Sequence, residues 1–204
     1  SVVQLGNAHA VYTETQMFLV NYIGLPNIFG YQPALEGDVG AVSSKSTVSV
    51  GRLNYGLSVN GFFETDGVNV NRIGQAQGID KYVQDFMAEP AQTAAYHNAD
   101  NQEIVWFVAI SDTKPSKELA YNYANQTWST RTTTLSAAIS KGVFNNFLSG
   151  NAAGEFFNEG NVPADQGNSI SVTATTKAFD LGEPDRIKEL TSIRIGKQGQ
   201  GEPT

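Results

Sequence analysis

The sequence has 204 residues, which is long enough for one sizeable hydrophobic core or two small ones. Only 16% of the residues are charged, and 20 acidic against 13 basic residues give a formal net charge of −7. Tight binding to nucleic acid depends on Lys and Arg contacts with phosphates, so this balance argues against it, although DNA could slide past an acidic or neutral surface. The absence of cysteine excludes disulfides, thiolate metal sites and cysteine nucleophiles. No apolar run approaches the ~18 residues of a membrane span, so no membrane partner is expected.

Short apolar segments near the start of the chain predict β-strands. Residues 17–24 form one expected strand, which Gly24 and Pro26 end. Residues 28–35 form the next. The sequence begins without a methionine or a signal-peptide pattern, so the chain is expected to be processed or to be part of a longer protein.

Residues 47–74 have the clearest pattern, because apolar and polar residues alternate there and turn signals interrupt them three times. The turn signals are Gly51-Arg52, Asn60-Gly61 and Asp66-Gly67. Asn-Gly and Asp-Gly tolerate the positive φ angles of type I′ hairpin turns. The segment therefore predicts a four-stranded antiparallel meander. Replacing Gly61 or Gly67 with a β-branched residue is expected to cost about 1 kcal/mol or more.

One helix is expected over residues 78–89. Its apolar residues recur at the helical spacing i, i+3, i+4 and i+7, which places them in one stripe. Pro90 ends the helix, and Asp80 near its start is expected to interact favourably with the helix dipole. The stripe consists of Ile79, Tyr82, Val83 and Phe86.

A second meander of four strands is expected after the helix, over residues 93–98, 103–111, 118–124 and 127–134. Asn125-Gln126 is its last turn, with Asn placed there for its tolerance of left-handed backbone. A third, weaker pattern follows in residues 135–150, 154–160, 169–182 and 189–196. Residues 154–160 repeat the aromatic pair that Phe62 and Phe63 form in the first meander.

Repeated four-stranded units of about 40–45 residues are typical of β-propeller blades. The predicted fold is therefore mainly β, a propeller-like array of four-stranded antiparallel meanders with one short helix. A β-sandwich with irregular loops is the alternative. We expect a single β-rich domain over residues 1–196 and a flexible tail over residues 197–204.

Three of these segments resemble the β-propeller portion of tail structural proteins of tailed bacteriophages, of the nozzle, tail-tube or DNA-stabilisation type. The resemblance covers roughly residues 40–160 and extends to the segment 177–190, whereas the region before residue 36 shows none of its patterns. The first pattern is Asn60, Gly61, Phe62, Phe63, Asp66 and Gly67; the second is Glu103, Ile104, Val105, Trp106 and Phe107; the third is Ala120, Tyr121, Asn122, Tyr123, Asn125, Trp128 and Ser129.

The resemblance implies a virion structural protein that is assembled in the host cytoplasm and works in the phage tail. Such proteins form a homo-oligomeric ring, commonly a hexamer, around the DNA passage, next to other tail and portal-proximal proteins. They act through subunit packing rather than catalysis. The resemblance implies no cofactor.

No catalytic or metal site is predicted. His9 and His97 have no local serine partner of the kind that a nucleophilic triad needs. The oxygen-rich segment 98–103 hints at a Ca²⁺ loop but lacks the glycine and the spaced glutamate of an EF-hand. A glycosidase needs two facing carboxylates, which keeps that activity as the weakest alternative. The candidates for it are Asp80, Asp85, Glu89, Glu155, Glu159 and Asp165.

The aromatic residues leave two interpretations open. A buried tyrosine or tryptophan ring removes roughly 150–250 Å² from water, so packing between sheets is the favoured role. The alternative is a carbohydrate-binding adhesin whose exposed rings stack on sugars. The residues expected to form structural turns and core are Gly61, Phe62, Gly67, Trp106, Tyr121, Tyr123 and Trp128.

Overall fold

The computed structural model describes residues 1–35, 39–139, 147–159, 164–165 and 168–169. The chain divides into two compact units, Ser1–Glu159 and Gly160–Thr204. The expected strands after residue 170, the domain boundary at residue 196 and the tail 197–204 lie outside the described residues. In the second unit, β16 (Ala164–Asp165) pairs antiparallel with β17 (Asn168–Ser169).

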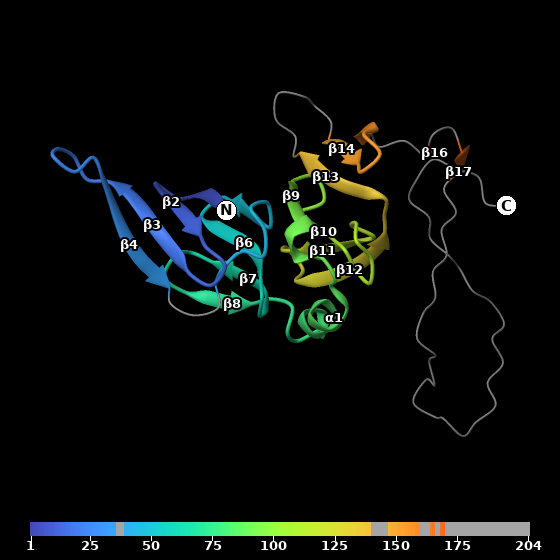
Figure 1. Ribbon diagram of the computed structural model, residues 1–204, viewed down its shortest axis with the longest axis horizontal. Coiled ribbons are helices and arrows are strands. Elements are labelled where there is room, and N and C mark those ends of the chain that lie inside the picture. The colour runs from blue at the N-terminus through green and yellow to red at the C-terminus, as the bar shows by residue number, and fades with distance from the viewer. Residues whose placement is uncertain (36–38, 140–146, 160–163, 166–167, 170–204) are drawn as a thin grey trace, which may run out of the picture. The chain divides into compact units, whose positions relative to one another are not determined.

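The first unit consists of antiparallel sheets in which consecutive strands are neighbours (Figure 1). The prediction of a mainly β chain with four-stranded meanders and one short helix is confirmed. The first sheet contains β1 (Val2–Leu5), β2 (Ala8–Tyr12), β3 (Met17–Tyr22) and β4 (Phe29–Leu35); the second contains β5 (Thr47–Val50), β6 (Leu53–Ser58), β7 (Gly61–Thr65) and β8 (Val70–Arg72); the third contains β9 (Ala94–Asn98), β10 (Glu103–Val108), β11 (Lys117–Asn122) and β12 (Thr127–Thr132); the fourth contains β13 (Leu135–Ile139), β14 (Phe147–Asn151) and β15 (Phe156–Glu159).

The first sheet was predicted only in part, because β1 and β2 were missed. Their signal is nevertheless present in the sequence. Leu5 precedes a Gly6-Asn7 turn, and the buried Ala10 and Tyr12 alternate with more exposed residues. Gly6 has the positive φ of 58° that this tight turn requires.

The predicted turns of the second sheet are present, but one of them is shifted. Gly51 has a φ of 63° in the two-residue turn between β5 and β6, as expected. Ser58 pairs directly with Gly61, so the next turn consists of Val59 and Asn60, one residue before the predicted Asn60-Gly61. Gly61, with a φ of 114°, is the first residue of β7.

The turn between β7 and β8 is longer than predicted, because Thr65 pairs with Val70 and residues 66–69 form the loop. The carboxylate of Asp66 accepts hydrogen bonds from the backbone N–H groups of Val68 (2.9 Å) and Asn69 (2.7 Å). These bonds lower the pKa of Asp66 to about 2. Gly67 has a φ of 94° in this loop, and Val68, predicted to lie in a strand, is exposed within it.

The helix α1 (Ile79–Phe86) ends three residues before the predicted end at Glu89. Beyond Phe86 the backbone leaves the helix to hydrogen-bond with the end of the third sheet. Ala88 N–H donates to the Ala109 carbonyl (2.9 Å), and Ser111 N–H donates to the Phe86 carbonyl (2.8 Å). Val83 is buried, whereas the Phe86 side chain is exposed, although the helical stripe included it. Pro90–Gln92 then form a short 3-10 turn.

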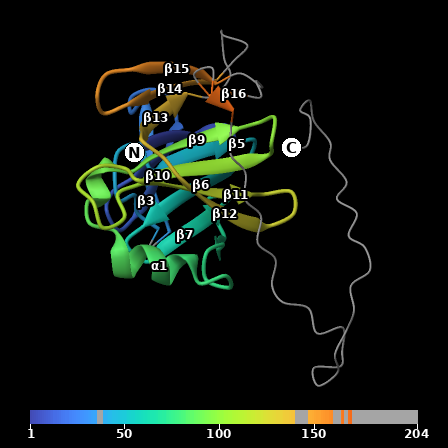
Figure 2. The ribbon, with the colours of Figure 1, turned by 90° about the vertical axis from the view of Figure 1, so that its right-hand side faces the viewer.

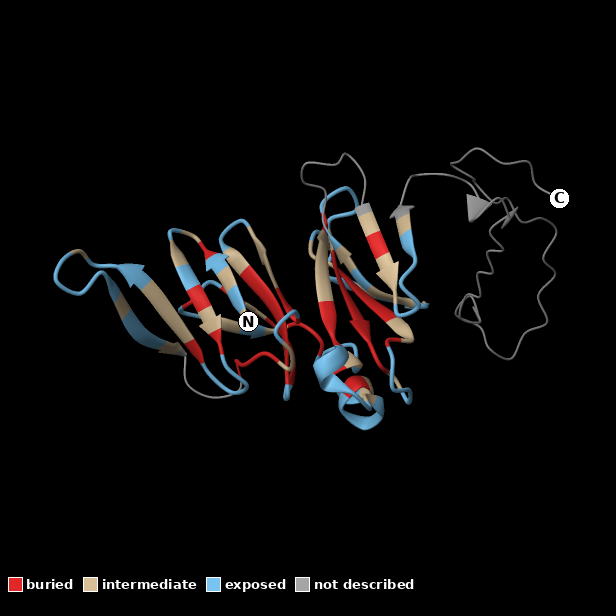
Figure 3. Ribbon diagram, turned by 45° about the horizontal axis from the view of Figure 1, so that its top comes forward, coloured by how far each residue is buried: buried red, intermediate tan, exposed pale blue. Residues whose placement is uncertain are grey.

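The sheets of the first unit contact one another through their first strands: β1 contacts β5, β5 contacts β9, and β9 contacts β13. Figure 2 shows these sheets one behind another, with α1 beside one end of them. Tyr12 and Met17 of the first sheet form one core with Phe63 of β7. Phe62, the neighbour of Phe63, points to the opposite face and belongs to the core shared with the third sheet. The second sheet is therefore buried on both faces (Figure 3).

Candidate functional site

An aromatic cluster joins the second and third sheets, and it contains several of the residues singled out from the sequence. Alternation along each strand places Phe62, Trp106, Tyr121 and Trp128 on the faces that meet. The ring of Phe62 lies 4.8 Å from that of Trp106 and 4.7 Å from that of Trp128, measured between centroids. The two indoles stack at 5.7 Å with an interplanar angle of 28°. This cluster holds the two sheets together.

Both indole N–H groups donate hydrogen bonds to backbone carbonyls that flank the second sheet. Trp106 Nε1 donates to the Ser46 carbonyl (3.0 Å), and Trp128 Nε1 donates to the Ile73 carbonyl (2.9 Å). Trp106 is fully buried and Trp128 is half-buried. Their rings and their donors are thus engaged in contacts within the protein.

A group of tyrosines continues the cluster. Tyr55 of β6 lies 6.3 Å from Tyr121 and 6.2 Å from Tyr123, measured between ring centroids. Tyr123 lies just beyond the end of β11, and its hydroxyl is 3.1 Å from Nε2 of His97. Burial raises the pKa values of Tyr55 and Tyr121, and the negative charge of Glu64 adds to both shifts. Burial lowers the pKa of His97.

Asp80 connects the helix to the second sheet, a contact that the sequence did not reveal. Its carboxylate accepts a hydrogen bond from the Phe62 N–H (2.8 Å) and is largely buried. Burial raises the pKa of Asp80, while the Phe62 N–H and the charge of Arg72 oppose that shift. A Cβ atom on Gly61 would lie 2.3 Å from the Asp80 Cγ, and one on Gly74 would lie 2.1 Å from its Oδ1. The carboxylate therefore leaves no room for a side chain at either position, and Gly61 is also required by its positive φ of 114°.

Gly67 lies where the second sheet approaches the first. A Cβ atom there would be 2.8 Å from the Leu5 Cδ2. Two further contacts join these sheets. The Asn54 amide, oriented to satisfy both of its ends, donates to the Gln4 carbonyl (2.9 Å) and accepts from the Tyr12 hydroxyl (3.0 Å).

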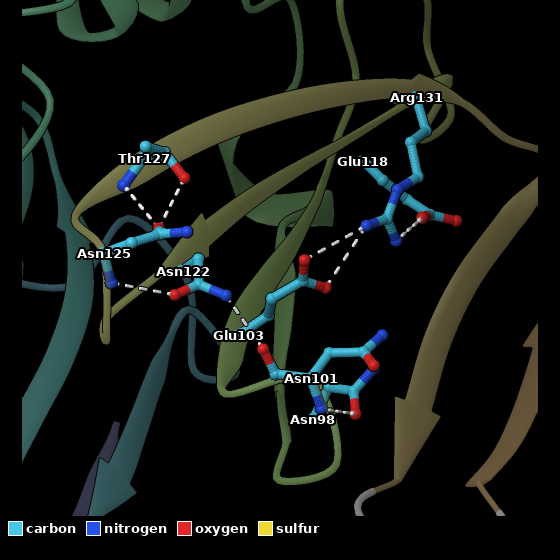
Figure 4. Close-up of polar contacts among 8 residues, drawn as sticks. All are labelled: Asn98, Asn101, Glu103, Glu118, Asn122, Asn125, Thr127 and Arg131. Atoms are coloured by element: carbon cyan, nitrogen blue, oxygen red, sulfur yellow. Dashed lines mark hydrogen bonds and ion pairs between the residues drawn. The ribbon is translucent and has the colours of Figure 1, made fainter. Parts of the chain in front are cut away.

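The opposite face of the third sheet has a polar network (Figure 4). Nη2 of Arg131 lies 3.2 Å from Oε2 of Glu103, and its Nη1 lies 3.7 Å from Oε2 of Glu118. The two carboxylates come from β10 and β11 and are mostly shielded from solvent, with 14% and 11% of their side chains exposed. An arginine between two carboxylates stabilises the negative charge of both.

The polar turn residues of this network bind one another. Asn98 Oδ1 accepts from the Asn101 N–H (3.3 Å), and the Asn101 carbonyl accepts from Asn122 Nδ2 (2.9 Å), so these oxygens of the suspected Ca²⁺ loop are used internally. Asn125 does not adopt the expected left-handed conformation. Gln126 does, with a φ of 58°, while Asn125 Oδ1 accepts from the Thr127 N–H and hydroxyl.

Two of the carboxylates considered for glycoside hydrolysis are engaged by neighbouring side chains. Asp85 pairs with Lys81 on the exposed face of α1 (2.7 Å), and Glu155 accepts a hydrogen bond from Asn151. The side chains of Glu159 and Asp165 lie outside the described residues. Within the described ranges, no group of three or more His, Asp or Glu residues could hold a metal ion. The helices described there also include none with the length and apolar character of a membrane span.

Comparison with known proteins identifies no family. No protein-family model matches the chain, and neither does any curated protein. A solved structure of a 2S albumin seed protein from Dolichos aligns with 88% of this chain and 92% of that chain, at 12% sequence identity and a TM-score of 0.38. A likeness this low carries no argument about fold or function.

Proposed function

We propose that the chain is a structural subunit of a bacteriophage tail. In this role its stacked sheets form a β-propeller-like element of a homo-oligomeric ring around the DNA passage. The subunit acts by packing and has no catalytic step.

The observation that carries the proposal is the double burial of the second sheet. Phe62 and Phe63 are adjacent residues on opposite faces of β7, and both are fully buried. In a β-sandwich, each sheet has one face in the core and one face in solvent. In a propeller, neighbouring blades cover both faces, and the serial contacts of β1, β5, β9 and β13 fit that arrangement.

The charge of the chain fits a surface past which DNA slides. With a net charge of −7, the protein repels phosphates overall and lacks the Lys and Arg excess that tight binding needs. A conduit for DNA requires weak contact with phosphates, because tight contacts would slow passage.

The mass of the purified chain in solution, measured by light scattering together with negative-stain imaging, tests the proposal. A closed ring of uniform subunit number is expected, without retention of duplex DNA at physiological salt. A clean monomer at high protein concentration contradicts the proposal. Glycan binding that is lost in Trp128→Ala, with the fold intact, would support the adhesin alternative instead.

A further inference from the structure

The hairpin of β3 and β4 extends beyond the other strands of the first sheet (Figure 1). β2 pairs with β3 only between Met17 and Val20. Farther along the hairpin, Asn21 pairs with Gly30 and Tyr22 pairs with Phe29, and none of the other described strands pairs with them there. This end of the hairpin, residues 21–31, is called the apex below.

The apex is uncharged and apolar. No Asp, Glu, Lys or Arg occurs anywhere in residues 15–35. Half of the twelve exposed large hydrophobic residues in the described part of the chain lie in the apex. They are Tyr22 (74% exposed), Ile23 (59%), Leu25 (87%), Ile28 (49%), Phe29 (56%) and Tyr31 (72%).

The apex is apolar on both of its faces. Tyr22 and Phe29 contact each other edge to face across one side, with ring centroids 6.4 Å apart. Ile23 lies over the other side, where a Cβ atom on Gly30 would meet its Cγ2 at 3.1 Å. A protein partner with a flat surface would cover only one of these sides. A lipid bilayer would surround both.

We propose that the apex inserts into the interfacial region of a phospholipid bilayer, with Leu25 deepest and with Tyr22 and Tyr31 at the level of the headgroups. Tyrosine favours this level because its ring is apolar and its hydroxyl is polar. The expectation of no membrane partner rested on the absence of a spanning segment. Shallow insertion needs no such segment.

The geometry limits the depth of insertion. Leu25 is three residue steps beyond Tyr22, which corresponds to at most about 10 Å at ~3.3 Å per residue. The Ile23 N–H donates to the Ile28 carbonyl (3.0 Å) and closes the loop. Backbone groups beyond that bond need water, so the apex stops at the boundary between headgroups and acyl chains. The net charge of −7 disfavours anionic lipid, so zwitterionic bilayers are the expected target.

Flotation of the purified protein with phosphatidylcholine vesicles tests the proposal. The unmodified chain is expected to float with the vesicles, and Leu25→Ser/Ile28→Ser is expected to lower the partition coefficient at least tenfold. Val59→Ser/Val68→Ser is the matched control, because these two valines are also exposed in turns, at 55% and 76%. It is expected to float like the unmodified chain. Vesicles with added phosphatidylserine should bind no better.

Leu25→Trp provides a measure of depth, since the indole at position 25 is expected to be quenched by lipids brominated near the headgroup end of the acyl chain. Trp106 and Trp128 of the unmodified chain serve as the unquenched reference. Failure of the unmodified chain to float overturns the proposal, as does equal loss in the two double variants. If the apex variant lowers the mass of the protein in solution while the unmodified chain stays off vesicles, the apex is a contact between protein chains instead.

Discussion

Two pairs of aromatic residues in neighbouring sheets have opposite environments. Phe62 and Phe63 in β7 are both fully buried, whereas Tyr22 and Phe29, which face each other across β3 and β4, are 74% and 56% exposed. The second sheet lies between two others, whereas the apex of the first sheet extends past its neighbours. The environment of an aromatic residue in this protein therefore depends on whether another sheet covers it.

The largest difference in unfolding free energy between the two regions is expected when an aromatic side chain is replaced with alanine. Trp106→Ala should lower the free energy of unfolding by about 3–5 kcal/mol, because it leaves a cavity among buried aromatic rings and removes the bond to the Ser46 carbonyl. Phe29→Ala should change it by no more than about 0.5 kcal/mol. Urea unfolding followed by circular dichroism measures both. Similar losses for the two variants would show that the apex is covered in solution.

Glycine substitutions compare a buried turn position with an open one in the second sheet. Gly61→Ala and Gly51→Ala both place a side chain at a positive φ, which costs roughly 1–2 kcal/mol. Gly61→Ala also drives a Cβ into the Asp80 carboxylate and should cost about 1–3 kcal/mol more, whereas the Cβ of Gly51→Ala meets nothing within 4 Å. Thermal unfolding measures the difference. Addition of Asp80→Ala should relieve part of the Gly61→Ala loss, and strict additivity would contradict the steric explanation.

Asp80 and Asp66 are expected to make the stability of the protein depend on pH in opposite directions. The pKa of the buried Asp80 is raised, so its contribution to stability is fully present below its unfolded value of about 3.9 and is lost as the pH rises through the folded value. The pKa of the exposed Asp66 is lowered to about 2, so its contribution is present above about 3.9 and is lost as the pH falls toward 2.

Urea titrations between pH 2 and 7 separate the two effects. Relative to Asp80→Asn, the unmodified chain should be most stable in acid. Relative to Asp66→Asn, it should lose its advantage in acid. Parallel curves for the two comparisons would mean that Asp80 is not desolvated in the folded state.

The smallest effects are expected for ion pairs. Lys81→Met removes an exposed pair on α1 and should cost about 0.3 kcal/mol, with the effect disappearing in 1 M salt. Arg131→Met leaves two shielded carboxylates without their cation and should cost about 1 kcal/mol or more, with weaker dependence on salt. Equal salt dependence for the two would show that the Arg131 network is open to solvent.

Much of the fold could be predicted because its cause is local. Alternating residues and turn signals located the strands of the second and third sheets, and helical spacing located α1. Errors arose where a distant segment, or a side chain two residues away, changed the preference of the backbone. The backbone after Phe86 left the helix to bond to the third sheet, and Val68 left its expected strand because the Asp66 carboxylate organises the loop.

The sequence alone located the turns of the second sheet to within one or two residues and showed which residues alternate, because these properties depend on backbone conformation within a few residues. Only the tertiary structure decided that Phe62 and Phe63 enter different cores, that Asp80 binds the Phe62 N–H, and that the Trp128 indole reaches the Ile73 carbonyl. It also decided that the apolar apex of β3 and β4 stays exposed. Burial depends on which sheets stack on one another, and alternation within one strand does not specify the neighbouring sheet.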